Sequence, residues 1–485
     1  MPSNLKPMAI THLTRVDIEQ RLPLAFTASE DVLGRLNIGT PLNPDLCDYL
    51  VRIYEASPKP ATEILLNPNT AKRDLDLILD KLDIKRDDLF WIHPKAGGTL
   101  RRQIVDLLHA NLEGHDPLIQ IVVGPRQVGK TTAVEHLIKE WQGKAHYAAA
   151  DAIVGDYGPW LEKQWQKALA SGENTLLVLD EIQKVKNWTD IVKKLWDASK
   201  SRGIRVVLLG STSLNHCLSR PIPESLSGRF VPIYVPHWSF AETQETFGCD
   251  LDQYTLYGGY PKAMELAHNS IAWQDYVGRA IINPIIDVDI YQQGRFKNVD
   301  NLRRAFRVFC QEFSTDINLT SLLNKIQHTG NTEIVKKYLN GFAEAFLLTQ
   351  LHHIDDNGFP DPRKNPRIMA NCPAVFTYGR DSMKSFSEDP IRFEQLVAGE
   401  LSRIPHTSFG YWQQSDKIGM DYFIKMPDQQ IFGITIERNE TKRSLARSYD
   451  LFRKTFDGAR IVSISPDNLP VFMQGQRAFL DMTAL

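Results

Sequence analysis

Short apolar runs alternate with stretches of helical periodicity over residues 99–247, and this alternation predicts an α/β fold. Runs of strand length, typical of strands buried on both faces of a parallel sheet, occupy 118–123, 175–179 and 204–209. An amphipathic helix is predicted over 99–113, with Arg101 and Arg102 away from its apolar face. That face consists of Leu100, Ile104, Leu107 and Leu108. Strands that alternate with helices favour a parallel sheet covered by helices on both faces.

The pattern changes on either side of this region. Residues 1–90 contain one stretch of helical spacing, near 44–53, and a second apolar stretch, 74–79, that fits a helix or a short strand. Residues 248–300 are predicted to be helical. Within 301–355, two predicted helices followed by an apolar run resemble a winged helix, and its lysines (Lys325, Lys336 and Lys337) suit either phosphate contacts or a solvated face.

Composition excludes several classes of protein. The 485 residues are 42% hydrophobic and 24% charged, with a formal net charge of −2, so no global basic field points to nucleic acid. The five cysteines are scattered, which predicts a reducing compartment and no zinc site. No apolar run of about 18 residues occurs, so we expect no membrane span and a cytoplasmic location.

A glycine-rich segment follows the first strand run and precedes a helical stretch. It matches G-x-x-x-x-G-K-[ST], the phosphate-binding P-loop, in the strand–loop–helix setting that the motif requires. The segment consists of Gly124, Pro125, Arg126, Gln127, Val128, Gly129, Lys130 and Thr131, followed by Thr132. The motif predicts that Lys130 reaches the β- and γ-phosphates of ATP and that the Thr131 hydroxyl binds Mg²⁺.

The second and third strand runs also end in polar residues. Asp180 and Glu181 end the second, about 50 residues after the P-loop. Asp180 is predicted to hold Mg²⁺, and Glu181 to polarise the attacking water. Ser211 follows the third run and is a candidate for sensing the γ-phosphate or that water, although a helix N-cap explains the nearby Ser213 equally well.

Two further segments, SLSGRF at 225–230 and YGGYP at 257–261, narrow the choice of family more than the P-loop does. Together with the P-loop, residues 95–485 resemble prokaryotic AAA-type ATPases with a carboxyl-terminal nuclease-like domain, near the STAND branch of P-loop switches. The resemblance implies that Arg229 contacts the γ-phosphate and that Pro261 belongs to a Gly-x-Pro segment packed against nucleotide. Arg229 also suits an exposed position, and Gly258-Gly259 a plain turn.

The C-terminal region holds three carboxylates, Glu400, Asp421 and Glu437, on a predicted helix and two strands. This pattern resembles the restriction-endonuclease-like core, in which such acids bind Mg²⁺ and a lysine two residues after the last acid helps to activate water. Asn439 stands at the lysine position, and Lys442 lies in a different register. Acids on a solvated sheet edge remain the alternative interpretation.

The predicted organisation is α/β: a P-loop ATPase sheet with a helical lid, a winged helix and a restriction-endonuclease-like α/β domain. The domains are predicted at 1–90 (helical, role unassigned), 91–247 (ATPase core), 248–300 (lid), 301–355 (winged helix) and 356–485 (nuclease-like). The predicted function is an Mg²⁺-dependent ATPase that acts as a nucleotide-controlled switch. The alternatives are an ATP-controlled DNA nuclease and an adaptor that holds nucleotide without hydrolysis. DNA contact through the winged helix or the C-terminal domain and a homo-oligomer or protein partner are further candidate interactions.

Overall fold

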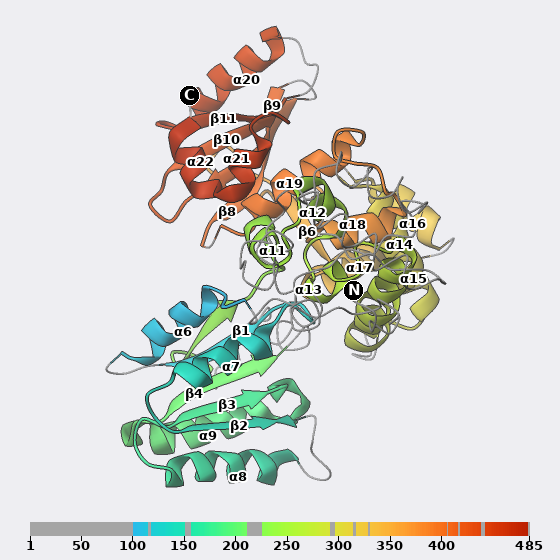
Figure 1. The fold of residues 1–485 in the computed structure, drawn as a ribbon. Helices are drawn as coiled ribbons and strands as arrows, with labels where there is room; N and C mark the ends of the chain where they lie inside the picture. Colours follow the sequence, from blue (N-terminus) through green and yellow to red (C-terminus); the bar gives the residue numbers. More distant parts are fainter. Residues whose placement is uncertain are drawn as a thin grey trace, which may run out of the picture.

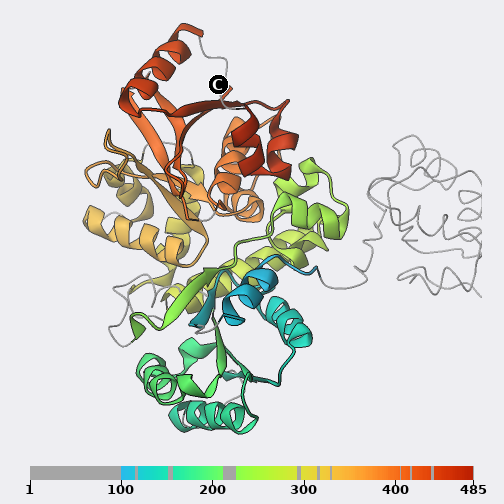
Figure 2. The same ribbon diagram turned by 90° about the vertical axis from the view of Figure 1, so that its left-hand side faces the viewer.

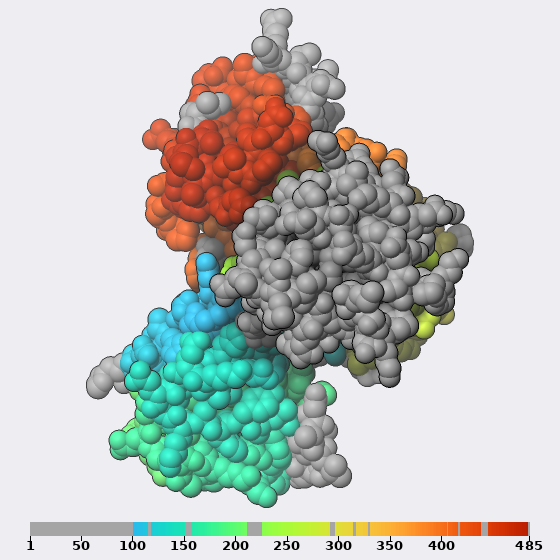
Figure 3. All heavy atoms as spheres, viewed as in Figure 1, coloured from blue at the N-terminus to red at the C-terminus, as the bar shows by residue number. Residues whose placement is uncertain are grey.

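The computed structural model describes residues 100–114, 118–150, 157–210, 226–291, 296–313, 317–327, 330–404, 406–415, 418–437 and 442–483. The predicted elements within 1–90 lie outside these ranges. The ATPase core, cyan to green, and the C-terminal residues, orange to red, form separate lobes (Figures 1 and 3). Within the described ranges, no helix is long and apolar enough to cross a bilayer.

A five-stranded parallel sheet forms the lobe of residues 100–247, with strand order β2-β3-β4-β1-β5. The strands are β1 (Ile119–Val123), β2 (Ala145–Ala149), β3 (Leu176–Asp180), β4 (Arg205–Gly210) and β5 (Phe230–Tyr234). Every residue of β1 and β3 is buried, as the continuous apolar runs predicted. The P-loop follows β1, which lies between β4 and β5.

Alternate side chains of this sheet enter two cores. Val122, Val178 and Val207 join the core shared with α6 (Ile104–Leu112) and α7 (Lys130–Glu140). Their strand neighbours pack on the opposite face with α8 (Tyr157–Ala170) and α9 (Trp188–Ser199). Helices therefore cover both faces of the sheet, which confirms the predicted α/β architecture (Figure 1).

The helix predicted over 99–113 is shorter than expected. It begins at Ile104 and buries Val105, Leu108 and Leu112, whereas Leu107 is 48% exposed. Arg102, predicted to lie away from the apolar face, is only 6% exposed because it bonds to backbone carbonyls outside the helix. The prediction was wrong because helical spacing alone cannot reveal a buried guanidinium.

Helices follow the sheet, as predicted for 248–300. They are α11 (Phe240–Phe247), α12 (Leu251–Tyr257), α13 (Pro261–Met264) and α14 (Ser270–Tyr276), which continues through the π-helical segments η6 (Val277–Ile282) and η7 (Ile285–Ile290). Ser239 and Glu242 form a capping box at the start of α11, in which each side chain binds the other residue's backbone N–H. We refer to the continuous run 270–290 as the lid helix.

Three helices and two antiparallel strands occupy the segment predicted as a winged helix and the residues just after it. They are α15 (Val299–Gln311), α16 (Leu319–Ile326), α17 (Thr332–Glu344), β6 (Leu348–His353) and β7 (Arg367–Ala370). The two predicted helices coincide with α16 and α17. The three-helix unit, α15–α17, packs on the lid helix: a Cβ added to Gly341 of α17 would lie 3.3 Å from Cγ2 of Ile290.

The C-terminal elements extend the sheet that β6 and β7 begin. They are α18 (Pro373–Arg380), α19 (Pro390–Leu401), β8 (Ser408–Ser415), β9 (Ile418–Lys425), β10 (Ile431–Ile436), α20 (Lys442–Thr455), β11 (Arg460–Ile464), α21 (Leu469–Gln474) and α22 (Gln476–Thr483). The six-stranded sheet has the order β11-β10-β9-β8-β6-β7, with β6 parallel to β8. The strands predicted to carry Asp421 and Glu437 correspond to β9 and β10. Figure 2 shows the three-helix unit and the C-terminal strands together in one lobe.

Gly259 occupies a position that no other residue fits. Its φ is +110°, and a Cβ would lie 2.5 Å from Cβ of Cys372. The carbonyl of Gly259 also accepts a hydrogen bond from the backbone N–H of Trp238 (3.0 Å). The YGGYP segment therefore joins the end of the ATPase core to the start of α18.

We expect Gly259→Ala to lower the thermal unfolding temperature more than Gly458→Ala. Gly458 also has a positive φ (+71°) but no atom within 4 Å of its hypothetical Cβ. The control should lose about 1 kcal/mol from the backbone conformation alone. Gly259→Ala adds overpacking, typically about 1–3 kcal/mol. Equal melting shifts in scanning calorimetry would contradict this account.

Candidate functional site

The P-loop adopts the strand–loop–helix arrangement that the motif predicted. Gln127 and Gly129 have positive φ angles of 59° and 88°, which turn the chain between β1 and α7. Lys130 is the first residue of α7, so the positive end of the helix dipole faces the loop. Gly124 lies against the residue that follows β5: a Cβ added to it would lie 2.2 Å from the carbonyl oxygen of Val235.

Lys130 points back into the loop. Its Nζ donates to the carbonyl oxygens of Gly124 (3.0 Å) and Pro125 (2.5 Å), both within the motif. Burial lowers its pKa to about 8, although the nearby carboxylates of Glu181 and Asp180 oppose that shift. A phosphate would supply the negative charge that the buried ammonium lacks.

Asp180 ends β3 beside the start of α7. Its Oδ2 accepts hydrogen bonds from Thr131 Oγ1 (2.9 Å) and Tyr147 OH (3.0 Å), and its Oδ1 accepts from the backbone N–H of Glu181 (2.8 Å). A hydroxyl and a carboxylate in contact fit the oxygen ligands that Mg²⁺ prefers. Tyr147, on β2, was not predicted, because nothing local in its sequence marks it as a neighbour of Asp180.

Glu181 follows with a left-handed backbone (φ 53°) and accepts a hydrogen bond from the Gln183 side chain. Among the charged groups that act on Lys130, Glu181 has the largest effect on its pKa. The two predicted acids therefore face the P-loop lysine.

The roles predicted for Thr132 and Ser211 stay predictions. Thr132 lies in the first turn of α7. Ser211 lies outside the described residues, and its role stays a prediction; β4, which it follows, lies between β1 and β3.

Arg229 lies at the wrong edge of the sheet for the predicted contact. It precedes β5, and its carbonyl accepts from the N–H of Ile119, the first residue of β1. Since β1 and β5 are parallel, the length of β1, about 13 Å, separates Arg229 from the loop at the other end. Its guanidinium instead pairs with Asp197 on α9 at 2.8 and 2.9 Å. Contact with nucleotide on the same chain is thus inconsistent with this fold.

Pro261 is the first residue of α13, a position that suits proline because its missing N–H has no partner there. Tyr260, beside it, is fully buried, and its hydroxyl lies 3.0 Å from His237 Nε2. The described contacts of this segment are with protein, so a contact between Pro261 and nucleotide stays a prediction.

Arg102 and Trp238 hold the P-loop from outside. The carbonyl of Val128 accepts from Trp238 Nε1 (3.0 Å) and from Arg102 Nη1 (3.2 Å). Arg102 also binds the carbonyl of Pro236 and forms a bidentate ion pair with Glu242 (2.6 and 3.1 Å). The same Glu242 caps α11, so one carboxylate connects the P-loop to the first helix after the sheet.

Two P-loop residues at positions that the motif leaves unspecified, Arg126 and Gln127, bind the lid helix. Arg126 forms a bidentate ion pair with Asp289 (2.6 and 2.5 Å), whose side chain is 3% exposed. Gln127 donates to the carbonyl of Ala280 (3.0 Å) and accepts from the Tyr276 hydroxyl. The lid helix therefore contacts the phosphate-binding loop directly.

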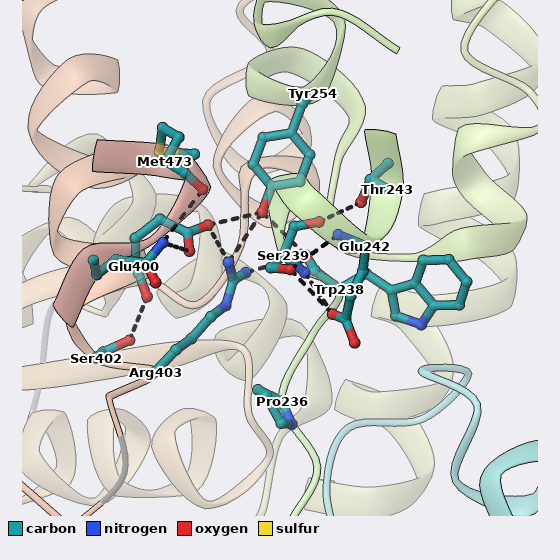
Figure 4. Close-up of polar contacts among 12 residues, drawn as sticks. Pro236, Trp238, Ser239, Glu242, Thr243, Tyr254, Glu400, Ser402, Arg403 and Met473 are labelled. Atoms are coloured by element: carbon teal, nitrogen blue, oxygen red, sulfur yellow. Dashed lines mark hydrogen bonds and ion pairs between the residues drawn. The ribbon is translucent and has the colours of Figure 1, made fainter. Parts of the chain in front are cut away.

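Glu400 does not belong to a metal-binding cluster. It is 2% exposed and pairs with Arg403, while its oxygens also accept from Tyr254 OH (3.2 Å) and Gln476 Nε2 (2.9 Å). Arg403 and Tyr254 both donate to the carbonyl of Trp238 (Figure 4). Burial opposes the charge of Arg403, but Glu400 and Tyr254 outweigh it and raise the pKa of the guanidinium. The predicted grouping of Glu400 with the other two acids was wrong.

Asp421 and Glu437 lie near one end of the antiparallel pair β9–β10. Asp421 Oδ2 accepts from the backbone N–H of Ile436 (2.7 Å), and Glu437 Oε1 from Ser463 Oγ (3.3 Å). Asn439 lies outside the described residues. Across the described ranges, no group of three or more His, Cys, Asp or Glu side chains could hold a metal ion.

The lysines considered for DNA contact are partly engaged within the protein. Lys325 pairs with Glu312, and Lys336 with Glu333 at 3.0 Å. A phosphate would have to compete with these carboxylates.

Comparisons with known proteins agree with the nucleotide site. Residues 116–244 match the family model of an AAA domain, and residues 249–371 match a family described as a domain of unknown function. An uncharacterized protein of Methanocaldococcus jannaschii is 21% identical over 434 residues, covering 84% of this chain and 90% of its own length.

Solved structures of the RuvB Holliday junction branch migration motor of Thermotoga maritima are also similar. One is 14% identical, with a TM-score of 0.28, and covers 55% of this chain and 91% of its own. A mutant of that motor covers 57% and 95%, with a TM-score of 0.29. The family match and the geometry of the site define an AAA-type P-loop domain within this chain.

We expect Glu400→Gln to destabilise the protein strongly, because it leaves the buried guanidinium of Arg403 without its counter-charge. Breaking such a buried pair typically costs about 3–5 kcal/mol. The matched control is Asp481→Asn, which breaks the exposed pair with Arg477 (2.8 Å) and should cost about 0–1 kcal/mol. Thermal unfolding of both variants checks the prediction, and a Glu400→Gln melting temperature equal to that of the control would contradict it.

Proposed function

We propose that this protein is an Mg²⁺-dependent ATPase that acts as a nucleotide-controlled switch. The observation that carries the proposal is the contact between Thr131 Oγ1 and Asp180 Oδ2 (2.9 Å) beside the buried Lys130. A P-loop lysine, a hydroxyl and a strand-end carboxylate are the parts that P-loop enzymes use to hold Mg²⁺ and the β- and γ-phosphates. The AAA family match over 116–244 supports the same class.

Each residue has a proposed role. Lys130 and the backbone N–H groups of 124–131 bind phosphate oxygens, and Thr131 and Asp180 hold Mg²⁺, which neutralises charge on the phosphates. Glu181 orients and polarises the attacking water. Tyr147 keeps the Asp180 carboxylate oriented through its 3.0 Å hydrogen bond. Arg229, half-buried at the far edge of the sheet, is proposed to act only on nucleotide held by a neighbouring copy.

The switch is proposed to act through the lid helix. It binds the P-loop through Asp289 and α15 through Asp287, whose carboxylate pairs with Arg303 (2.6 and 3.0 Å). The three-helix unit in turn shares a sheet with the C-terminal strands. Its packing on the lid helix favours a winged helix that relays nucleotide state over one that reads DNA bases.

Two substitutions separate binding from hydrolysis. Lys130→Ala should abolish tight ATP binding, because the P-loop motif places the ammonium of Lys130 directly on the β- and γ-phosphates. Glu181→Gln should leave ATP bound and reduce turnover by about 10²-fold or more, because an amide cannot polarise water as a carboxylate does.

Nucleotide titration and phosphate release check these outcomes on the full chain. Native ATP affinity in Lys130→Ala would reject the nucleotide site. Binding without turnover in the unmodified protein would favour an adaptor that holds nucleotide without hydrolysis.

We further propose that the C-terminal domain does not cut DNA. Its core combines α19, an antiparallel meander β8-β9-β10, α20 and β11 parallel to β10, which supports the nuclease-like resemblance. Glu400 is engaged by Arg403, however, and Asn439 cannot supply the positive charge of a lysine. The domain is proposed to serve as a docking surface.

Plasmid and linear DNA should therefore stay intact with the purified protein in Mg²⁺ or Mn²⁺, with or without ATP. Gel electrophoresis measures the outcome. Cleavage that disappears in an Asp421→Ala, Glu437→Ala double variant would establish the ATP-controlled nuclease instead.

A further inference from the structure

A buried carboxylate lies next to the phosphate-binding loop. Asp289 of the lid helix is 3% exposed, and its partner Arg126 is the third residue of the P-loop motif. The ion pair is bidentate, so Asp289 occupies the Nε/Nη2 edge of the guanidinium, one of the two edges at which a phosphate could bind. An acid in this position is unexpected, since the loop must accept a highly anionic ligand.

Both members of the pair lie within electrostatic reach of Lys130. Burial has the largest effect on the Lys130 pKa, followed by Glu181 and Asp180; Arg126 then lowers this pKa further and Asp289 raises it. Lys130 marks where the β- and γ-phosphates bind. A γ-phosphate there would be attracted by Arg126 and repelled by Asp289.

From this geometry we propose that Asp289 is a specificity-determining residue that competes with the γ-phosphate for Arg126 and thereby sets the preference between ATP and ADP. The proposal rests on the ATP site proposed above. ADP, which has no γ-phosphate, leaves the pair intact. ATP draws Arg126 toward the γ-phosphate and leaves a buried carboxylate without its counter-charge, which favours displacement of the lid helix.

The lid helix is connected to the three-helix unit by two contacts. Asp287, two residues before Asp289, pairs with Arg303 of α15, and Ile290 packs on α17 at Gly341. The lid helix is thus attached to the P-loop on one side and to the three-helix unit on the other. Competition at Arg126 would therefore move the attachment of the three-helix unit.

The test compares ATP with ADP in full-length protein. Isothermal titration with Mg·ATP and Mg·ADP is performed in the Glu181→Gln background, which suppresses hydrolysis. Asp289→Asn should shift the affinity ratio toward ATP by about 10-fold, within the usual range of coupling between sites. Arg126→Gln should shift it toward ADP, because the γ-phosphate loses its cation and faces Asp289 alone.

Asp275→Asn is the control, since it removes an exposed Asp–Arg pair on the same helix (Asp275 with Arg279, 2.6 Å) that touches neither the P-loop nor α15. It should leave the ATP-to-ADP ratio within about two-fold of the parent. Equal changes in ATP and ADP affinity in Asp289→Asn, or the same ratio shift in the control, would overturn the proposal. If Asp289→Asn fails to fold, Arg126→Gln decides: an unchanged ratio overturns the inference.

A Lys130→Ala variant in the same background separates the existence of the ATP site from the effect of Asp289 on it. Loss of binding to both nucleotides supports the P-loop site whatever the ratios show. Retained binding would reject that site itself.

Discussion

The carbonyl oxygen of Val128 is the point at which the P-loop is tied to the chain on both sides of the parallel sheet. A P-loop must keep its N–H groups turned toward phosphate, so its carbonyls need partners on the outer side. Arg102 and Trp238 supply them, one from before β1 and the other from after β5. The carbonyl of Trp238 in turn accepts hydrogen bonds from Tyr254 of α12 and from Arg403, which follows α19. One chain of hydrogen bonds therefore links the P-loop to α12 and to the end of α19.

Local features of the site could be predicted from the sequence. A buried strand, a glycine-rich loop and a helix are adjacent in the chain, so the P-loop and the Asp180–Glu181 strand end were recognised from residue order alone. Tyr147 and Asp289 were missed because their partners, Asp180 and Arg126, are 33 and 163 residues away. No pattern within one element identifies such a contact.

The predictions that the fold revised have related physical causes. Arg229 was assigned from a motif that does not specify which edge of the sheet its residues occupy. The register of β5 against β1 places it away from the P-loop of its own chain, so a role at a neighbouring copy stays a proposal. Glu400 was grouped with Asp421 and Glu437 by residue type. In the fold it is buried on α19, where Tyr254 and Gln476 donate hydrogen bonds to its carboxylate. Arg102 shows the same effect, because the backbone carbonyls of Val128 and Pro236 bury a guanidinium that hydropathy places at the surface.

The sheet that joins β6 to β8 limits how this protein can be divided. The match to the domain of unknown function ends at residue 371, just after β7, yet β6 forms hydrogen bonds with β8 beyond that boundary. A fragment cut there would expose one side of β6 as an unpaired edge, the kind of surface that recruits foreign strands. The segments on either side of that boundary therefore share one sheet, and an exchange of either half alone would have to supply a new strand to pair with β6 or β8.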